Sequence, residues 1–416
     1  MIFEKTVLPG GVRVLTERMP EVLSVSLGFW VGVGSRDEPT DLQGSSHFLE
    51  HLLFKGTEHR SARDIAETFD AVGGEANAFS TKEYTCFYGR VIDKDLPMAM
   101  EVLTDMLSQP SLAPSDVESE RNVILEELAL HEDTPEDLVH DLFCETIFAD
   151  HPLGAEVMGT TSTVKAITPE SLGTFHSDNY HALNVVVSAA GAVDHGQVVD
   201  AMAVLFGQDN KPALVRTHSD PTPRARLKVA PRTTEQSHLV LGGLGYAREH
   251  PSRFAWGVLD VLLGGGMSSR LFQEVRERRG LAYSIYSYRT TFSETGSWAV
   301  YAGISPNNAA EVLKVITHEL DSLLTDGITE RELERAKGHM RGGVVLGLED
   351  PSSRMSRLGK SELMHGEILT IDEIVKRVDA VTTEDVSQVA QELLQPESRI
   401  LTVIGPFSED DFPDWN

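Results

Sequence analysis

The sequence has little of several residue types, and each scarcity excludes a class of protein. Only Cys86 and Cys144 are present among 416 residues. They are too few for a disulfide framework and lack the spacing of a metal-binding cysteine cluster, so we expect buried thiols. No apolar run approaches the roughly 18 residues of a membrane span, so no membrane partner is expected. Met1–Lys5 leads into a strand-like segment without a charged and then apolar leader, which predicts a cytoplasmic protein.

Basic residues are also scarce. The chain has 36 Lys and Arg against 64 Asp and Glu, a net charge of −28. This balance disfavours nucleic acid as a partner and favours cationic partners. A generally acidic surface that indicates nothing about any partner is an equally open interpretation.

One short motif carries chemistry. The run His47-Phe48-Leu49-Glu50-His51 places two histidines at i and i+4, which share a face of a helix and can hold one metal ion. Two neutral histidines suit Zn²⁺, which at a catalytic site takes a third protein ligand and keeps one position open for water. Bound zinc lowers the pKa of that water to about 7, and the nearby Glu50 carboxylate can take its proton. The order H-x-x-E-H is among the signatures of metallopeptidases.

The residues around the motif predict a helix. Thr40-Asp41 offers a helix start and Gly56 a stop. An apolar flank would press this helix onto a core and leave the ligands facing a cavity. The flank consists of Phe48, Leu49, Leu52 and Leu53.

A second predicted helix, over residues 116–130, offers the third ligand. Glu120, Ile124 and Glu127 lie at i, i+4 and i+7, so two carboxylates share one stripe with an isoleucine. Glu126 points only about 100° away from Glu127 on such a helix. Periodicity therefore leaves both Glu126 and Glu127 open as the ligand.

Three separated runs together resemble the pitrilysin, or insulinase-like, family of zinc peptidases, and within it the subgroup of the mitochondrial processing peptidase and its bacterial relatives. The runs are Gly44–Thr57, Gly74–Ser80 and Glu120–Glu127. The resemblance implies one zinc ion per chain, with His47, His51 and Glu127 as ligands. It implies further that Glu50 is the general base and that Glu120 orients a ligand. It thereby selects Glu127 over Glu126.

The chain also contains a long internal repeat. Leu49–Gly56 matches Leu259–Gly266 at an offset of 210, and Glu120-Arg121 matches Glu334-Arg335 at an offset of 214. Residues 207–226, which are rich in proline and polar residues, suit a linker. We therefore predict an α+β fold of two homologous domains, each a mostly antiparallel sheet covered by helices. The zinc-binding domain is predicted over 1–210 and a domain without metal over 223–416.

The repeat bears on the metal site. At the positions of His47, His51 and Glu127 the second half has Gly257, Val261 and Arg341, none of which would serve as a zinc ligand. The loss of all three together favours a site that exists in one copy only.

The second half contains a different pair of interest, Arg276 and Tyr283. In the family that the sequence resembles, an Arg and a Tyr spaced seven apart hold the substrate and the oxyanion, and these two residues have that spacing. An Arg can bind a peptide carbonyl and a phenol can donate to a developing O⁻. Without the resemblance, the pair would more often be ordinary surface and core residues.

A substrate-binding edge is predicted next to the zinc motif. The segment Asn77-Ala78-Phe79-Ser80 precedes a strand-like segment over residues 84–91 and can form a sheet edge to which an extended peptide adds as another strand. Phe54 and Phe79 would wall an apolar pocket near the metal, although both also suit a role as core aromatics.

Together these features predict a zinc endopeptidase that cleaves peptides or unfolded polypeptide segments inside a chamber, with basic peptides favoured by the negative charge of the chain. Relatives of this chain length enclose their chamber by pairing two chains. Because this chain has both the zinc residues and the Arg/Tyr pair, a homodimer is expected. The alternative from another class is a non-catalytic peptide-binding or assembly subunit of the same family.

Overall fold

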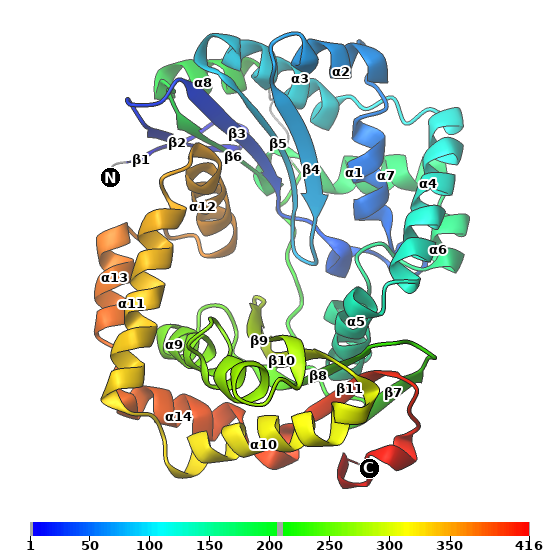
Figure 1. Ribbon diagram of the computed structural model, residues 1–416. Coiled ribbons are helices and arrows are strands. Elements are labelled where there is room, and N and C mark those ends of the chain that lie inside the picture. The colour runs from blue at the N-terminus through cyan, green and yellow to red at the C-terminus, as the bar shows by residue number, and fades with distance from the viewer. Residues whose placement is uncertain (1–2, 206–210, 416) are drawn as a thin grey trace. The chain divides into compact units, whose positions relative to one another are not determined.

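The computed structural model describes residues 3–205 and 211–415, which form two compact units (Figure 1). The first unit contains Met1–Ala129, Ala155–Thr217 and Leu346–Leu369, and the second contains Leu130–Gly154, His218–Val345 and Thr370–Asn416. Each unit is a sheet with helices packed on it, which confirms the predicted α+β fold in two domains.

The first unit is built on a six-stranded sheet in the order β1-β2-β6-β3-β5-β4. The strands are β1 (Phe3–Val7), β2 (Arg13–Arg18), β3 (Ser24–Val31), β4 (Glu75–Ser80), β5 (Thr85–Ile92) and β6 (Val185–Gly191). Neighbouring strands are antiparallel except β2 and β6, which are parallel. Strand β4 ends the order and is therefore an edge, where another extended chain can pair.

The second unit repeats this arrangement in a five-stranded sheet of order β7-β11-β8-β10-β9. The strands are β7 (Leu227–Pro231), β8 (Ser237–Gly245), β9 (Ala282–Thr291), β10 (Gly296–Ile304) and β11 (Ile400–Gly405). Only the pair β7 and β11 is parallel within the described strands of this sheet. The order and directions match β2-β6-β3-β5-β4, as expected for an internal duplication.

Helices cover both sheets. Those of the first unit are α1 (Ser45–Leu53), α2 (Ala62–Asp70), α3 (Leu96–Ser108), α4 (Pro114–Glu132, in most of its length), α6 (Thr161–Ala166), α7 (Pro169–Asn179), α8 (His195–Leu205) and α12 (Pro351–Met364). Those of the second are α5 (Pro135–Phe148), α9 (Arg253–Leu263), α10 (Ala309–Thr325), α11 (Glu330–Gly347, in most of its length), α13 (Ile371–Asp379) and α14 (Thr383–Leu393).

Each unit includes one helix from the opposite half of the sequence. Helix α12 packs on β2, β3 and β6, on the face of the first sheet opposite to α3 and α8 (Figure 1). Helix α5 packs on β7, β8 and β11 of the second sheet. Each exchanged helix packs with its sheet in a smaller apolar cluster, which is separate from the main core of the unit. The predicted ranges 1–210 and 223–416 follow the sequence repeat and do not include this exchange.

The approach of α12 to its sheet depends on a glycine. A Cβ atom on Gly359 would lie 2.0 Å from Nε1 of Trp30, a buried residue of β3. That indole nitrogen donates a hydrogen bond of 2.8 Å to Oγ of Ser188, which in turn donates one of 2.9 Å to the Met355 carbonyl oxygen. The helix is thus held by apolar packing and by a buried hydrogen-bond chain.

Two predicted helix starts need correction. The zinc-motif helix begins at Ser45 and not at Thr40-Asp41, because Thr40–Leu42 forms a separate 3₁₀ turn and Gly44 has the left-handed φ of 97°. The second helix begins at Pro114, two residues earlier than predicted.

Part of the predicted linker is attached to the first unit. Residues 211–217 belong to the first unit, and the Leu214 amide donates a hydrogen bond of 2.9 Å to the Asn184 side chain. The remainder of the predicted linker that precedes residue 211, and Met1 and Ile2 of the predicted N-terminal segment, lie outside the described residues.

The structure bears on two expectations, the absence of a membrane span and the burial of both cysteines. In the described part of the chain, no helix has both the length and the apolar character that a membrane crossing needs. Cys86 is buried, whereas Cys144 is only partly buried. The prediction of a buried thiol is therefore right for Cys86 and wrong for Cys144, which lies on the amphipathic helix α5.

Candidate metal centre

Helix α1 positions two of the predicted ligands. Its apolar flank, Phe48, Leu49, Leu52 and Leu53, is at most 1% exposed and belongs to the main core of the first unit. Burial of these four side chains fixes the rotation of the helix about its axis. His47 is buried, and His51 and Glu50 are half-buried on the remaining faces.

Helix α4 supplies the acidic residues. Glu120 and Ile124 are buried, Glu127 is half-buried, and Glu126 is exposed. The stripe predicted from the i, i+4 and i+7 spacing is therefore the face of α4 that is turned to the interior. The structure places Glu127, and not Glu126, beside the two histidines.

His47, His51 and Glu127 form a cluster whose ligand atoms all lie within 4.8 Å of one another. Oε2 of Glu127 is 3.7 Å from Nε2 of His47 and 3.6 Å from Nε2 of His51. Two ligands at tetrahedral positions around one zinc ion lie about 3.3 Å apart, given metal–ligand bonds of about 2.0 Å. Two imidazoles and one carboxylate are also a donor set of catalytic zinc sites, so the residues fit this metal.

The environment of His47 favours the neutral ring that a metal requires. Burial, together with the neighbouring His51, lowers the pKa of His47 to about 4. Its Nδ1 atom is buried and has no hydrogen-bond partner among the described residues, whereas Nε2 faces the cluster. A neutral imidazole keeps a lone pair for coordination at neutral pH.

Glu120 contacts His51 at its non-cluster nitrogen, and Lys55 contacts Glu120. Oε2 of Glu120 lies 3.2 Å from Nδ1 of His51, and Nζ of Lys55 lies 2.6 Å from Oε1 of the same carboxylate. A carboxylate at the non-coordinating nitrogen fixes the tautomer and orientation of a ligand ring. This contact fits the orienting role of Glu120, which stays a prediction. Sequence reasoning missed Lys55, whose signal is its position one helical turn after His51.

Glu50 is linked to the edge strand. Burial raises the pKa of Glu50, while side-chain and backbone hydrogen bonds with Ser80 oppose that rise. Ser80 is the last residue of β4, the strand predicted to pair with substrate. The predicted base therefore lies where the metal cluster and the edge strand meet. The sequence alone shows Ser80 only as the end of the edge segment and does not reveal its contact with Glu50.

The structure does not bring Phe54 and Phe79 together. Phe54 packs against the main core, with its ring 6.4 Å from that of Phe87. Phe79 packs on the opposite face of the sheet beside Trp30, at 6.1 Å between ring centroids. Successive side chains of β4 point to opposite faces of the sheet, so Phe79 lies on the face opposite to that of Ala78 and Phe54. Asn77 is exposed and Ala78 is partly buried on the α1 side. The roles of these four residues in substrate binding stay predictions.

Arg276 and Tyr283 are neighbours in the second unit. Arg276 lies in a π-helical turn, η6 (Phe272–Glu277), and its guanidinium carbon is 4.6 Å from the centre of the Tyr283 ring. Tyr283 is 79% exposed, so its hydroxyl is accessible. An exposed phenol stacked under a guanidinium differs from the core tyrosine that the alternative interpretation described.

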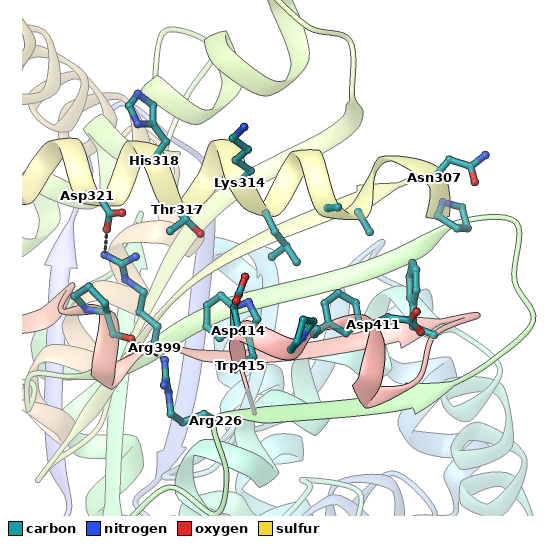
Figure 2. Close-up of a pocket in the computed structure, with 18 residues that line it drawn as sticks. Arg226, Asn307, Lys314, Thr317, His318, Asp321, Arg399, Asp411, Asp414 and Trp415 are labelled. Atoms are coloured by element: carbon teal, nitrogen blue, oxygen red, sulfur yellow. Dashed lines mark hydrogen bonds and ion pairs between the residues drawn. The ribbon is translucent and has the colours of Figure 1, made fainter.

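A large cavity elsewhere in the second unit is separate from all predicted site residues. It measures about 830 Å³ and lies between α10 and the C-terminal segment (Figure 2). Its walls include Lys314, His318, Arg399 and Trp415, and Asp321 forms an ion pair of 2.7 Å with Arg399. It contains no carboxylate–histidine cluster comparable to that of α1 and α4 among the described residues. The chemistry therefore points to the cluster and not to the cavity.

The sequence matches two family models. Residues 13–161 match the model described as Insulinase (Peptidase family M16), and residues 166–340 match the model described as Peptidase M16 inactive domain. The metal cluster lies in the first match and the Arg276/Tyr283 pair in the second.

Similar proteins extend over nearly the whole chain. An uncharacterized zinc protease of Streptomyces coelicolor is 48% identical over 97% of this chain and 90% of its own length. An uncharacterized zinc protease of Bacillus subtilis is 40% identical over 95% of this chain and 96% of its own length.

Solved structures share the fold. A peptidase M16 inactive domain from Pseudomonas fluorescens has a TM-score of 0.91 at 21% identity and covers 98% of both chains. A protease from Helicobacter pylori has a TM-score of 0.88 at 22% identity over 97% of this chain and 100% of its own. With the relatives at 40% and 48% identity, these findings establish that the chain belongs to the insulinase family of peptidases.

Proposed function

We propose that this protein is a zinc-dependent endopeptidase that cleaves peptides or unfolded polypeptide segments within a chamber. The observation that carries the proposal is the cluster of His47, His51 and Glu127, with Glu50 one residue from a ligand and Glu120 behind His51. The names of the relatives, which include zinc proteases from several bacteria, agree with this activity.

The residues of the site divide the work of peptide hydrolysis. Zinc, when bound, supplies the Lewis acidity that polarises a peptide carbonyl and makes water more acidic. Glu50 takes the proton of the attacking water and returns it to the leaving amine. Glu120 keeps the His51 ring in the orientation that turns Nε2 to Glu127. The roles of Glu50 and Glu120 are thus performed by side chains of the first unit.

The Arg276/Tyr283 pair completes the proposed mechanism. The guanidinium binds a substrate carbonyl, and the Tyr283 hydroxyl donates a hydrogen bond to the oxygen on which negative charge develops. The stacking of the two side chains supports this role, because it presents both donors at one exposed place. We propose further that two identical chains assemble, so that the pair of one protomer serves the zinc site of the other.

The proposed substrates are extended and preferably basic. Strand β4 is a sheet edge next to Glu50, and pairing along a main chain requires an extended peptide but reads little of its sequence. The excess of 64 acidic over 36 basic residues favours cationic peptides by long-range attraction.

A zinc and activity assay tests the proposal. Purified protein should contain about one zinc per chain and should cleave an unstructured basic peptide internally, and removal of the metal by a chelator should abolish cleavage reversibly. A chain that binds zinc and peptide but cleaves none would instead be the non-catalytic subunit. A chain without bound zinc after growth in zinc-supplemented medium would contradict the assignment of the cluster.

A further inference from the structure

The loop between β3 and α1 contains three consecutive charged residues that contact three different elements. The first, Arg36, donates a hydrogen bond of 2.7 Å to Oε1 of Glu83, in the turn between β4 and β5. Both residues are buried, at 7% and 2% exposed. A buried guanidinium–carboxylate pair fixes the backbone on both sides, and Nη1 of Arg216 lies 3.8 Å from the same Glu83 oxygen.

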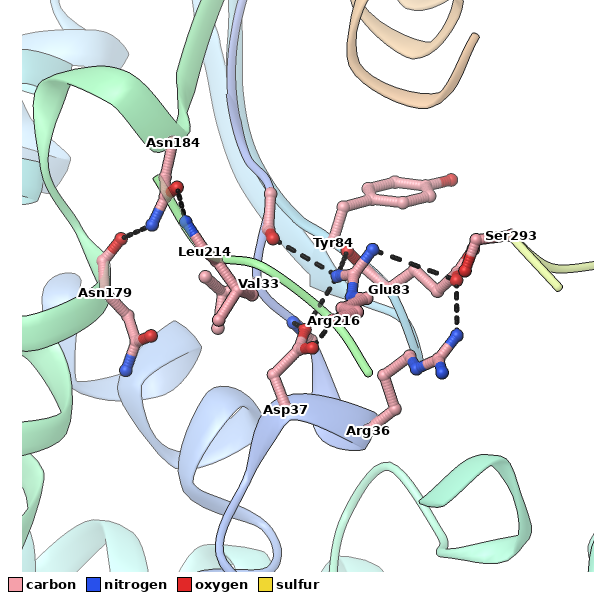
Figure 3. Close-up of polar contacts among 12 residues, drawn as sticks. Val33, Arg36, Asp37, Glu83, Tyr84, Asn179, Asn184, Leu214, Arg216 and Ser293 are labelled. Carbon is pink, nitrogen blue, oxygen red and sulfur yellow. Dashed lines mark hydrogen bonds and ion pairs between the residues drawn. The ribbon is translucent and has the colours of Figure 1, made fainter. Parts of the chain in front are cut away.

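The second residue, Asp37, is held by the segment that joins the two halves of the sequence. Arg216 donates to both oxygens of Asp37, at 2.8 and 2.7 Å, and also to the Gly32 and Glu83 carbonyl oxygens at 3.2 and 2.6 Å (Figure 3). A bidentate guanidinium–carboxylate pair sets geometry as well as energy. The Gly34 amide donates to the same carboxylate at 2.9 Å. The hydrogen bonds from Arg216 and from the Gly34 amide therefore fix the position of Asp37 and of the loop that contains it.

The third residue, Glu38, contacts the start of the zinc-motif helix. Its Oε2 accepts a hydrogen bond of 2.7 Å from the Gly44 amide, and its Oε1 accepts one of 2.6 Å from the Ser46 amide. The two amides are at the N-cap and at the second position of α1. Both lie at the start of α1, in the turn that carries His47.

Glu38 replaces a cap that α1 lacks. The first amides of a helix have no partner within it, and the residue at the N-cap usually supplies one with its side chain. Here the N-cap is Gly44, which has a φ of 97° and no side chain. A Cβ at this position would lie 2.6 Å from the Met158 carbonyl oxygen, so a conventional capping residue does not fit. Burial raises the pKa of Glu38 to about 7, while the hydrogen bonds from the Ser46 and Gly44 amides oppose that rise.

We propose that Glu38 is a positioning residue for the metal site: it fixes the first turn of α1 and thereby the distance between His47 and the ligand on α4. This inference rests on the proposed function, since it assigns a role toward zinc. It follows from the contacts that a rigid loop, anchored by Arg36 and Asp37, carries Glu38 and that Glu38 alone holds both described amides of the turn. Without it the first turn frays, and His47 is the ligand on that turn.

Zinc affinity, measured by competition with a coloured chelator and without peptide, tests the role. Glu38→Gln replaces one acceptor oxygen by an N–H donor, so one amide loses its partner. We expect a loss of zinc affinity of about tenfold, the lower end of the effect of removing residues that support metal ligands. The matched control is Asp350→Asn, which weakens the cap of α12 in the same unit, where Asp350 accepts from the Ser353 amide at 3.0 Å. This control should change zinc affinity by less than about twofold.

Each outcome either supports the positioning role or overturns it. A folded Glu38→Gln variant with the zinc affinity of the parent overturns it, as does an equal loss in Asp350→Asn, which would mean a general effect of destabilisation. If Glu38→Gln does not fold, Glu38→Asp decides: its shorter carboxylate cannot span both amides, so a reduced affinity supports the role and an unchanged one refutes it. If the parent protein binds zinc but cleaves no peptide, the proposed function fails while the positioning role is judged by affinity alone.

Discussion

Oε2 of Glu120 lies 3.2 Å from Nδ1 of His51, while Lys55 neutralises the other oxygen of that carboxylate at 2.6 Å. A carboxylate at Nδ1 leaves Nε2 of the ring for coordination and raises the basicity of the ligand. We therefore expect Glu120→Gln to lower zinc affinity by about 10- to 100-fold without removing a ligand. Equilibrium competition with a chelator measures this change.

The control for Glu120 is Glu118→Gln on the same helix. Glu118 is exposed, pairs with Arg121 at 2.9 Å and is not part of the metal cluster. Solvent screens the exposed Glu118 carboxylate, so this variant should bind zinc normally. If both variants bind zinc as the parent does, Glu120 does not orient His51.

Glu50 should separate metal binding from catalysis. Glu50→Gln removes the proton acceptor but no ligand, so zinc content should stay at about one per chain while turnover falls by a factor of at least about 10² to 10⁴. Metal analysis and peptide hydrolysis on the same preparation test both expectations. Hydrolysis at the parent rate would disprove the role of Glu50 as the base.

Glu126, the residue before the proposed ligand Glu127, provides the control for the third ligand. Glu127→Gln should lower zinc content and activity together, because one of three ligands is lost, whereas Glu126→Gln should leave both unchanged, because Glu126 is exposed. Zinc titration of the two variants side by side decides between them. The reverse pattern would move the ligand role to Glu126.

The site could be predicted from sequence where its residues are periodic. His47 and His51 share a helix face, and Glu120, Ile124 and Glu127 share another, so local spacing indicates the two histidines and the acidic stripe. The choice of Glu127 over Glu126 comes from the family resemblance. Local spacing does not contain the partners Glu38 and Ser80. Glu38 is six residues before the helix cap that it replaces, and a capping rule searches only the first turn, which is why the sequence pattern favours a helix start at Thr40-Asp41.

The fold shows the same division. The repeat and the strand patterns predict two similar α+β domains, because alternation and offsets can be counted in the sequence. They do not predict that α12 packs on the first sheet, since the contact of Gly359 with Trp30 joins residues more than 300 positions apart. In a sequence, a glycine within a helical segment indicates only a residue that disfavours the helix. The indole of Trp30, which leaves no room for a Cβ, explains why glycine is present at position 359.

That contact gives a prediction for stability. Gly359→Ala places a Cβ 2.0 Å from the Trp30 nitrogen, in a site where both residues are buried. Overpacking of this kind costs about 1 to 3 kcal/mol. The control, Gly343→Ala in α11, meets no atom within 4 Å and should stabilise the protein by up to about 1 kcal/mol through helix propensity. Urea unfolding compares the two; equal effects would contradict the tight packing of α12.

The lowered pKa of Glu332 predicts that the stability of the folded protein depends on pH. Burial would raise its pKa, but hydrogen bonds from Arg270 and the Thr329 amide outweigh this and lower the pKa of Glu332 to about 2. Because the folded-state pKa lies below the ordinary 4.5, the stabilisation is fully present above about pH 4.5 and is lost as pH falls toward 2. With allowance for solvent screening, Glu332→Gln should cost about 2 kcal/mol at pH 7 and little at pH 2.

Denaturant unfolding at several pH values measures this difference. The control is Glu373→Gln, which removes the same kind of capping carboxylate, bonded to the Thr370 amide at 2.7 Å, from the exposed start of α13. Its effect should be smaller at every pH because solvent screens it. A Glu332→Gln penalty that does not change between pH 7 and pH 2 would show that charge is not its cause.

The last prediction concerns assembly. The metal cluster belongs to the first unit and the Arg276/Tyr283 pair to the second, and the proposed homodimer combines them across protomers. Glu50→Gln chains and Arg276→Ala/Tyr283→Phe chains should then each be nearly inactive alone. A mixed dimer has one defective site with both losses and one site with both parts intact.

Mixing the two variants under conditions of subunit exchange should therefore restore activity. With equal amounts, half of the dimers are mixed and each has one working site of two, so roughly a quarter of the parent activity should return. Mixing before and after chemical cross-linking is the control, because cross-linked homodimers cannot exchange and should stay inactive. If exchange is shown by labelled subunits and no activity returns, each site is completed within a single chain, since two defective chains would then never share an intact site.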